Sequence, residues 1–198
     1  MSKLLERAVG EFSKLPGIGE RTAMRLVLHL LSQPEIGVSM FANSISDFRK
    51  NIKFCSVCNN LSDNDICPIC SDNTRDKSVV CVVEHVKDVM SIEQTGKFRG
   101  VYHVLGGLIS PMNGVGPSSL KIDLLTSNVV EREVKEVVLA LSTSIEGETT
   151  SFFIAKKLEN TGVQISTIAR GVGFGDDLDY ADDLTLMHAF NNRVKFTK

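Results

Sequence analysis

Four cysteines in two CxxC pairs are the residues of this sequence whose spacing most clearly predicts chemistry. The first pair is Cys55 and Cys58, and eight residues separate it from the second pair, Cys67 and Cys70. Each CxxC can place two thiolates on one tight turn, and four thiolates can meet at a tetrahedral Zn²⁺. The loop between the pairs is polar and cannot build a core, so a metal would have to hold it.

A disulfide pair and a redox-active CxxC are the alternatives for the same four residues. A single CxxC would leave both alternatives open, whereas two pairs at this spacing favour zinc. Four protein ligands leave no open coordination position, so the predicted zinc is structural rather than catalytic. We expect the zinc loop to separate two parts of the chain that have different functions.

A glycine-rich turn near the N-terminus has the composition of a phosphate site. Apolar periodicity predicts a helix over 4–15, a second helix after the turn, and a third helix that runs up to the cysteines. In the turn, Gly17 and Gly19 offer backbone N–H groups at a helix start, with no Cβ to block a phosphate. Arg21 and Arg25 on the second helix could add positive charge. A plain helical corner with solvated arginines explains the same residues, because one glycine-rich turn is a weak signal.

Composition and charge place broad limits on the protein. The chain has 198 residues, 42% of them hydrophobic and 23% charged, which suits one large or two small globular domains. Residues 1–54 carry eight Lys and Arg and five Asp and Glu, a net charge of +3, and the rest carries −5. A basic head on an acidic body fits a DNA contact made by the head alone, although an excess of three charges also fits chance.

The sequence also predicts a cellular compartment. It has no apolar run long enough to span a membrane and no signal-peptide pattern at its start. Together with four clustered thiols, this predicts the reducing cytoplasm. The fifth cysteine, Cys81, lies in an apolar run and is expected to be a buried strand residue.

After the zinc loop, the pattern changes to strands that alternate with helices. The predicted strands are 79–83, 101–105, 137–141 and 164–169, and the predicted helices between them are 85–95, 120–132 and 148–160. This alternation predicts an α/β fold with a parallel sheet and helices on both faces. Because sites form at the carboxyl ends of such strands, we expect Glu84 and the 142–147 loop at that edge. The glycine-rich loop 106–117 is expected to be irregular.

The order of these features resembles the RecR family of bacterial recombination mediators over nearly the full length. The turn Leu15-Pro-Gly-Ile-Gly19 and its helices are similar to a helix-hairpin-helix motif, which grips nucleic-acid backbone without reading sequence. In that family a four-cysteine zinc finger, a Toprim domain and a short C-terminal segment follow. The resemblance implies a helix-hairpin-helix region over 1–53, a zinc finger over 54–77, a Toprim domain over 78–170 and an assembly segment over 171–198.

The Toprim resemblance bears on catalysis. In Toprim enzymes a Glu after the first strand works with an Asp-x-Asp after the third, and these carboxylates bind Mg²⁺. Here Glu84 holds the first position, but the Asp-x-Asp position reads Ser-Thr-Ser at 142–144. Glu146 and Glu148 match the family's Glu-Gly-Glu pattern, so the three glutamates could meet a partner or hold a weak Mg²⁺. Glu148 could equally be a favourable charge at a helix start. The resemblance therefore indicates a fold and not an activity.

Other enzyme classes lack their motifs in this sequence. It contains no P-loop and no GxSxG, and the glycines at 171–175 have the wrong spacing for a dinucleotide fingerprint. A topoisomerase would need a nucleophilic tyrosine on a separate domain, but Tyr102 lies within a predicted strand and Tyr180 in an acidic tail. In the RecR family this tail resembles a Walker-B segment that takes part in subunit assembly.

The resemblance implies a non-enzymatic mediator of DNA repair and recombination, associated with the nucleoid in the bacterial cytoplasm. Such a protein would bind single- and double-stranded DNA without sequence preference and form a homotetrameric ring or clamp around it. It would act with RecO and RecF to load recombinase on single-stranded DNA. A small Mg²⁺-dependent Toprim primase or nuclease is the alternative, and a zinc-ribbon adaptor that touches only protein is a third hypothesis.

Overall fold

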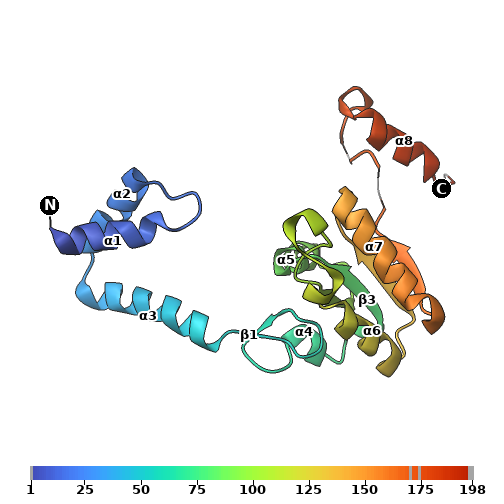
Figure 1. Ribbon diagram of the computed structural model, residues 1–198, viewed down its shortest axis with the longest axis horizontal. Coiled ribbons are helices and arrows are strands. Elements are labelled where there is room, and N and C mark those ends of the chain that lie inside the picture. Colours follow the sequence, from blue (N-terminus) through green and yellow to red (C-terminus); the bar gives the residue numbers. More distant parts are fainter. Residues whose placement is uncertain (1, 170, 174, 196–198) are drawn as a thin grey trace. The chain divides into compact units, whose positions relative to one another are not determined.

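The chain divides into two compact units, Met1–Ile52 and Lys53–Lys198. A computed structural model describes residues 2–169, 171–173 and 175–195 (Figure 1). The first unit contains three helices, which are α1 Lys3–Ser13, α2 Glu20–Leu31 and α3 Glu35–Asn51. The second unit contains the cysteine loop, the sheet and the C-terminal segment.

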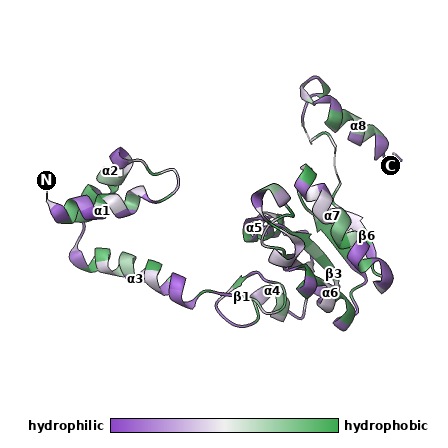
Figure 2. Ribbon diagram, in the orientation of Figure 1, coloured by the Kyte–Doolittle hydropathy of each residue, from purple (hydrophilic) through white to green (hydrophobic). Residues whose placement is uncertain are grey.

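Two helices of the first unit pack on each other, whereas the third helix has no buried residue. Val9 of α1 and Ala23 of α2 are buried where these helices meet. By contrast, none of the 17 residues of α3 is buried. Figure 2 shows that hydrophobic residues nevertheless recur along this helix. The first unit thus leaves an apolar helix surface exposed.

The cysteine loop opens the second unit with short elements only. They are β1 Lys53–Phe54, β2 Leu61–Ser62 and α4 Pro68–Ser71. β1 and β2 pair antiparallel, with Lys53 opposite Ser62 and Phe54 opposite Leu61. Two-residue strands and a one-turn helix cannot persist by themselves, so other interactions must hold this loop.

A four-stranded parallel sheet forms the centre of the second unit. Its strands are β3 Asp76–Val83, β4 Gly100–Val104, β5 Glu136–Ala140 and β6 Gln164–Thr167, in the order β4-β3-β5-β6. The helices between them are α5 Val86–Gln94, α6 Ile122–Glu131 and α7 Ile145–Leu158, and α8 Asp183–Asn191 follows the sheet. The predicted α/β fold, with an N-terminal helical region and a parallel sheet, is confirmed.

Alternating residues of β3 build the two apolar layers of this unit. Val80 and Val82 belong to the cluster that includes residues of α6 and α7, whereas Cys81 and Val83 belong to the cluster that includes α5. Successive side chains of a strand point to opposite faces, so a continuous apolar run serves both layers. The buried position predicted for Cys81 is confirmed, because its exposed fraction is 2%.

The start of α7 differs from the prediction. The helix begins at Ile145 rather than at Glu148, because Ser144 caps it by accepting a hydrogen bond from the Gly147 N–H at 3.1 Å. A Cβ at Gly147 would lie 2.1 Å from the Ser142 carbonyl oxygen, so only glycine fits this first turn. Glu146 and Glu148 therefore belong to the helix start.

The loop expected to be irregular contains local order. Ser110 and Val115 form an antiparallel bridge, and 3₁₀ turns cover Pro111–Asn113 and Pro117–Ser119. Ile109 is buried and donates its N–H to the Thr150 hydroxyl of α7 at 2.9 Å. Further 3₁₀ turns are Glu159–Thr161 and Leu178–Tyr180. Among the described helices, none has the length and hydropathy needed to cross a membrane.

His103 is a buried titratable group in the middle of this fold. Its exposed fraction is 2%, and its Nε2 lies 2.8 Å from the Lys121 carbonyl oxygen. A carbonyl can only accept, so Nε2 carries the proton of a neutral ring. Burial lowers the pKa of His103 to about 4.

This depressed pKa predicts a loss of stability in mild acid. The unfolded histidine titrates near 6.5, so the unfolded chain binds a proton first and the unfolding free energy falls between pH ~6.5 and about 4. From pH 7 to pH 5 the loss should be about 2 kcal/mol. His103→Gln keeps an N–H donor but cannot titrate, so its loss should be smaller by that amount. Urea unfolding at both pH values measures this, and equal losses in parent and variant would contradict it.

Candidate metal centre and nucleic-acid interface

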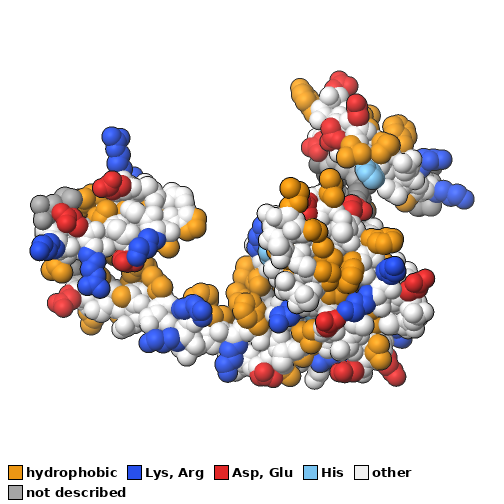
Figure 3. All heavy atoms as spheres, in the orientation of Figure 1, with side chains coloured by type: hydrophobic (Ala, Val, Ile, Leu, Met, Phe, Trp, Pro, Cys, Tyr) orange, Lys and Arg blue, Asp and Glu red, His pale blue; other side chains and the backbone are white. Residues whose placement is uncertain are grey.

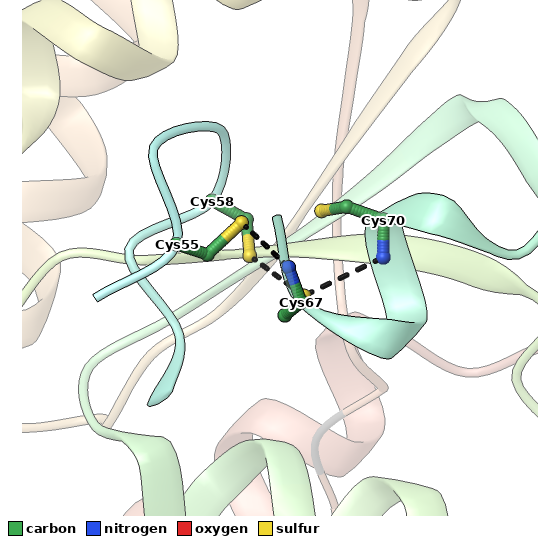
Figure 4. A group of neighbouring side chains, drawn as sticks. All are labelled: Cys55, Cys58, Cys67 and Cys70. Atoms are coloured by element: carbon green, nitrogen blue, oxygen red, sulfur yellow. Dashed lines mark hydrogen bonds between the residues drawn. The ribbon is translucent and has the colours of Figure 1, made fainter. Parts of the chain in front are cut away.

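The four predicted cysteines converge on one point. The Sγ atoms of Cys55, Cys58, Cys67 and Cys70 all lie within 4.8 Å of one another, and all four residues are buried (Figure 4). The Cys58 and Cys67 sulfurs are 3.6 Å apart. Zinc–sulfur bonds of about 2.3 Å in a tetrahedron put sulfurs about 3.8 Å apart. The donor set and its spacing therefore fit a closed, structural zinc site.

Local backbone geometry positions each pair of sulfurs. After Cys55 the chain turns so that the Asn59 N–H donates to the Cys55 carbonyl at 2.9 Å, and Asn59 adopts a left-handed φ of 59°. Asparagine tolerates this conformation better than most residues. In the second pair, Cys67 is the N-cap of α4 and Cys70 lies in its single turn. Pro68 at the first helical position favours this start.

Backbone N–H groups also point at the sulfurs. The Cys67 N–H donates to Cys55 Sγ at 3.3 Å, and the Cys70 N–H donates to Cys67 Sγ at 3.4 Å. Hydrogen bonds from the Cys58 and Cys70 side chains, and then from this backbone N–H, hold the pKa of Cys67 well below its usual range. The contact with Cys67 in turn raises the pKa of Cys58. The thiolate is the form that binds zinc, so it is the two backbone N–H contacts that favour metal binding. All of these cysteines are free of disulfides.

The predicted hairpin residues lie together in the first unit. Gly17 has a φ of +79°, which explains glycine there, whereas Gly19 is the extended N-cap of α2. No side chain caps this helix, and the first-turn N–H groups of residues 20–22 have no acceptor among the described residues. A Cβ at Gly19 would meet no atom within 4 Å, so the space in front of the turn is open.

Two arginines follow on the same helix. Arg21 and Arg25 are exposed and one turn apart, and neither side chain has a hydrogen-bond or ion-pair partner in the described part of the chain. In contrast, the nearby Lys14 pairs with Glu11 at 2.8 Å. The hairpin thus combines open N–H groups with two uncompensated positive charges, an arrangement that suits phosphate.

The three predicted glutamates lie after β3 and in the first turn of α7. Glu84 follows β3 and contacts His85 Nε2 at 3.0 Å, while Glu146 and Glu148 lie in the first turn of α7. Over residues 2–169, 171–173 and 175–195, only the four cysteines form a group of three or more potential ligands close enough for one ion. The hydroxyls of Ser142 and Ser144 bond to each other at 2.9 Å where Toprim enzymes have carboxylates.

Three residues that contribute to these sites were not predicted. Asn59 sets the geometry of the turn at residues 55–59, here called the zinc turn, and Gly147 sets that of the start of α7. His103 is buried next to the loop that follows β4. The Asn-Asn pair after the second cysteine is a turn signal that could have indicated Asn59. The environment of His103 depends on Lys121, which is distant in sequence, whereas Gly147 meets the Ser142 carbonyl only five residues before it, through a turn geometry that has no periodic signal.

The metal site predicts different outcomes for two buried cysteines. Cys58→Ala removes one of four ligands, so zinc content should fall from about one per chain to well below half, and the 55–70 loop should lose order. The sheet should persist, because its two apolar clusters do not include this residue. Metal analysis, far-UV circular dichroism and limited proteolysis of the loop measure these effects.

Cys81→Ala is the matched control for this prediction. Cys81 is also buried, but it lies in the sheet and is not part of the four-cysteine group. This variant should keep full zinc content. If Cys58→Ala keeps its zinc, or both variants lose it equally, the four-cysteine site is not the one that holds the metal.

Comparison with known proteins finds matches along most of the chain. Residues 5–49 match the RecR helix-hairpin-helix model, residues 52–72 the RecR zinc finger of Cys₄ type, residues 78–169 a Toprim domain, and residues 171–194 the RecR C-terminal model. The zinc-finger match and the four close sulfurs together support the predicted structural zinc.

Curated relatives match over nearly their whole length. Recombination protein RecR of Bacteroides thetaiotaomicron is 58% identical over 196 residues, covering 99% of this chain and 96% of the relative. The proteins of that name from Porphyromonas gingivalis and Flavobacterium johnsoniae are 52% and 50% identical, with 99% and 100% of this chain and 95% and 96% of the relatives covered. The chain belongs to the RecR family of recombination proteins.

Proposed function

We propose that this protein is a DNA-binding mediator of recombination and repair that works without catalysis. The observation that carries the proposal is the hairpin of the first unit, where Gly19 starts a helix with open N–H groups and Arg21 and Arg25 have no described partner. Such a surface contacts phosphates and reads no bases, so binding should be independent of sequence. Gly17 supplies the tight turn that brings the backbone close to a phosphate.

A single hairpin is too weakly charged for useful affinity. The whole chain carries a net charge of −2, and the second part of the sequence is acidic. Non-specific DNA binding depends on several phosphate contacts made together. Several hairpins on one assembly would raise the effective concentration of each additional contact. This argument favours a multimer whose hairpins all reach the same DNA.

Exposed apolar helices in both units support self-assembly. On α3 the exposed apolar residues include Ile36, Met40, Phe41, Ile45 and Phe48, and on α8 they are Leu184, Met187 and Phe190. Figure 3 shows such side chains at the surface of the C-terminal segment. We propose that the α3 face and the α8 face each pair with the same face of another copy. Two such two-fold contacts on one chain generate closed assemblies. The smallest is a tetramer, which fits the proposed clamp around DNA.

Partner proteins follow from the family resemblance. We propose that the assembly acts with RecO and RecF to help load recombinase on single-stranded DNA, and that it works at the bacterial nucleoid. Glu84, Glu146 and Glu148 are the acidic residues proposed for a partner contact at the carboxyl end of the sheet. Rim charges of this kind mainly steer association and select the partner.

The functional division that we propose follows the sequence. Residues 1–53 bind DNA, residues 54–77 form the zinc finger, residues 78–170 form the Toprim domain and residues 171–198 serve assembly. The main alternative is a Mg²⁺-dependent Toprim enzyme. The hydroxyl pair of Ser142 and Ser144 argues against it, since hydroxyls are poor replacements for carboxylates on Mg²⁺. Mg²⁺-dependent DNA cleavage or primer synthesis that disappears in Glu84→Ala would favour the enzyme.

The hairpin predicts a charge-specific loss of DNA binding. Arg21→Gln with Arg25→Gln should weaken binding at fixed salt by at least about tenfold, because one charge-assisted contact contributes roughly 1.5 to 3 kcal/mol. Lys14→Gln is the control, since this exposed lysine is already paired with Glu11. It should change the affinity little. Fluorescence anisotropy with a labelled oligonucleotide measures binding, and size-exclusion chromatography verifies that each variant assembles as the parent does.

Gly19→Ala tests the backbone contact separately from the charges. Alanine is compatible with the φ of −84° at this position and meets no atom within 4 Å, so folding should be unchanged. Its methyl group would occupy the space proposed for a phosphate, and affinity should fall. If this variant and the arginine double variant both bind DNA like the parent, the hairpin is only a structural corner.

A further inference from the structure

The zinc finger covers the open side of an edge strand. β4 is the first strand in the order β4-β3-β5-β6, so only one of its sides pairs with another strand. Unpaired backbone groups at a sheet edge need other partners when they are buried. Val104 ends this strand and is buried, with an exposed fraction of 2%. The hydrogen-bond partners of its backbone therefore identify the segment that covers this edge.

Two residues of the zinc turn bond to this one strand residue. The Val104 N–H donates to the Cys58 carbonyl at 2.8 Å, and the Asn59 side-chain N–H donates to the Val104 carbonyl at 2.8 Å. Cys58 is a zinc ligand by position, and Asn59 follows it directly. The zinc turn thus replaces a neighbouring strand at the end of β4.

The residues that follow Val104 bond to the carboxyl end of β3. The Leu105 N–H donates to the Val83 carbonyl at 3.0 Å, and the Gly106 N–H donates to the Glu84 carbonyl at 2.9 Å. The Leu105 carbonyl in turn accepts from the Lys121 N–H at 3.1 Å, which closes the base of the loop after β4. Hydrogen bonds at Val104 and at Gly106 therefore link the zinc turn to the backbone of Glu84.

The direction of the Asn59 side chain depends on the tight turn that begins at Cys55. Its backbone N–H donates to the Cys55 carbonyl, and its left-handed φ of 59° turns the side chain out of the turn. A second contact holds the same turn, because Asn128 of α6 donates to the Val57 carbonyl at 2.6 Å. The turn can only keep these contacts while its own geometry is fixed.

We propose that Asn59 is a positioning residue through which the zinc finger orders the carboxyl edge of the β3–β4 pair, including the backbone of Glu84. Zinc coordination fixes the 55–58 turn, the turn fixes Val104, and Val104 fixes Leu105 and Gly106. The inference goes beyond DNA binding and does not depend on it, since the hairpin lies in the other unit.

Hydrogen exchange with matched variants tests this link. Asn59→Gly removes the side-chain amide and keeps the left-handed backbone free of strain. Asn60→Gly is the control, because Asn60 is also buried but its side chain accepts only from the Leu61 N–H at 2.9 Å. In Asn59→Gly, peptides that cover 101–107 should exchange roughly 5- to 100-fold faster, as expected for one lost buried hydrogen bond. In Asn60→Gly they should exchange as in the parent.

Zinc content and zinc removal decide between the remaining outcomes. Faster exchange of 101–107 at full zinc content supports Asn59 as the link, whereas faster exchange only together with zinc loss counts against it. Parent protein treated with a chelator should also exchange faster at 101–107, while peptides of α1 remain unchanged. If the zinc-free parent keeps its protection there, or both glycine variants behave alike, the inference is wrong.

Discussion

The closure of four sulfurs around one point is the constraint on which the start of the second unit depends. Residues 53–72 contain two two-residue strands, a one-turn helix and almost no apolar core. Among the partly buried hydrophobic residues that the structure describes, two pack against the cysteines, Val57 and Ile69. Local secondary structure of this length is unstable in water, so the metal supplies the missing free energy.

Apolar and charged contacts join the segment that contains the finger to the sheet. Ile69 packs against the cysteine cluster and against both apolar layers of the sheet, so it belongs to all three. Arg75 pairs with Glu93 of α5 at 2.5 Å and donates to the Gly100 carbonyl at 3.1 Å. The Tyr102 hydroxyl of β4 donates to the same glutamate at 2.6 Å and so holds it in place for Arg75. These apolar and charged contacts join the cysteine loop and the sheet into one unit, as the division of the chain at residue 52 indicates.

The sequence predicted those features that depend on local patterns. The CxxC spacing, the buried runs around Cys81 and the helical periodicity of the first unit all report neighbours close in the chain. The start of α7 was predicted three residues too late. Ser144 was assigned to the preceding loop, whereas its side chain caps the helix. The contact of Asn59 with Val104 spans 45 residues. The close approach that requires Gly147 is local, to the Ser142 carbonyl, but it arises from the cap geometry and not from a repeating pattern. Neither feature leaves a periodic signal in the sequence.

The two units of the chain have different proposed roles. In the proposed function, the hairpin would contact DNA phosphates, and the unit with the zinc finger and the sheet would provide surfaces for assembly and partners. We propose that several hairpins hold one DNA, and the salt dependence of DNA affinity is the most direct test of this claim. Two arginines per hairpin on four subunits predict a slope of log K against log salt of roughly −6 to −7. A slope of about −2 or less in magnitude, as expected for a single hairpin, would contradict the claim.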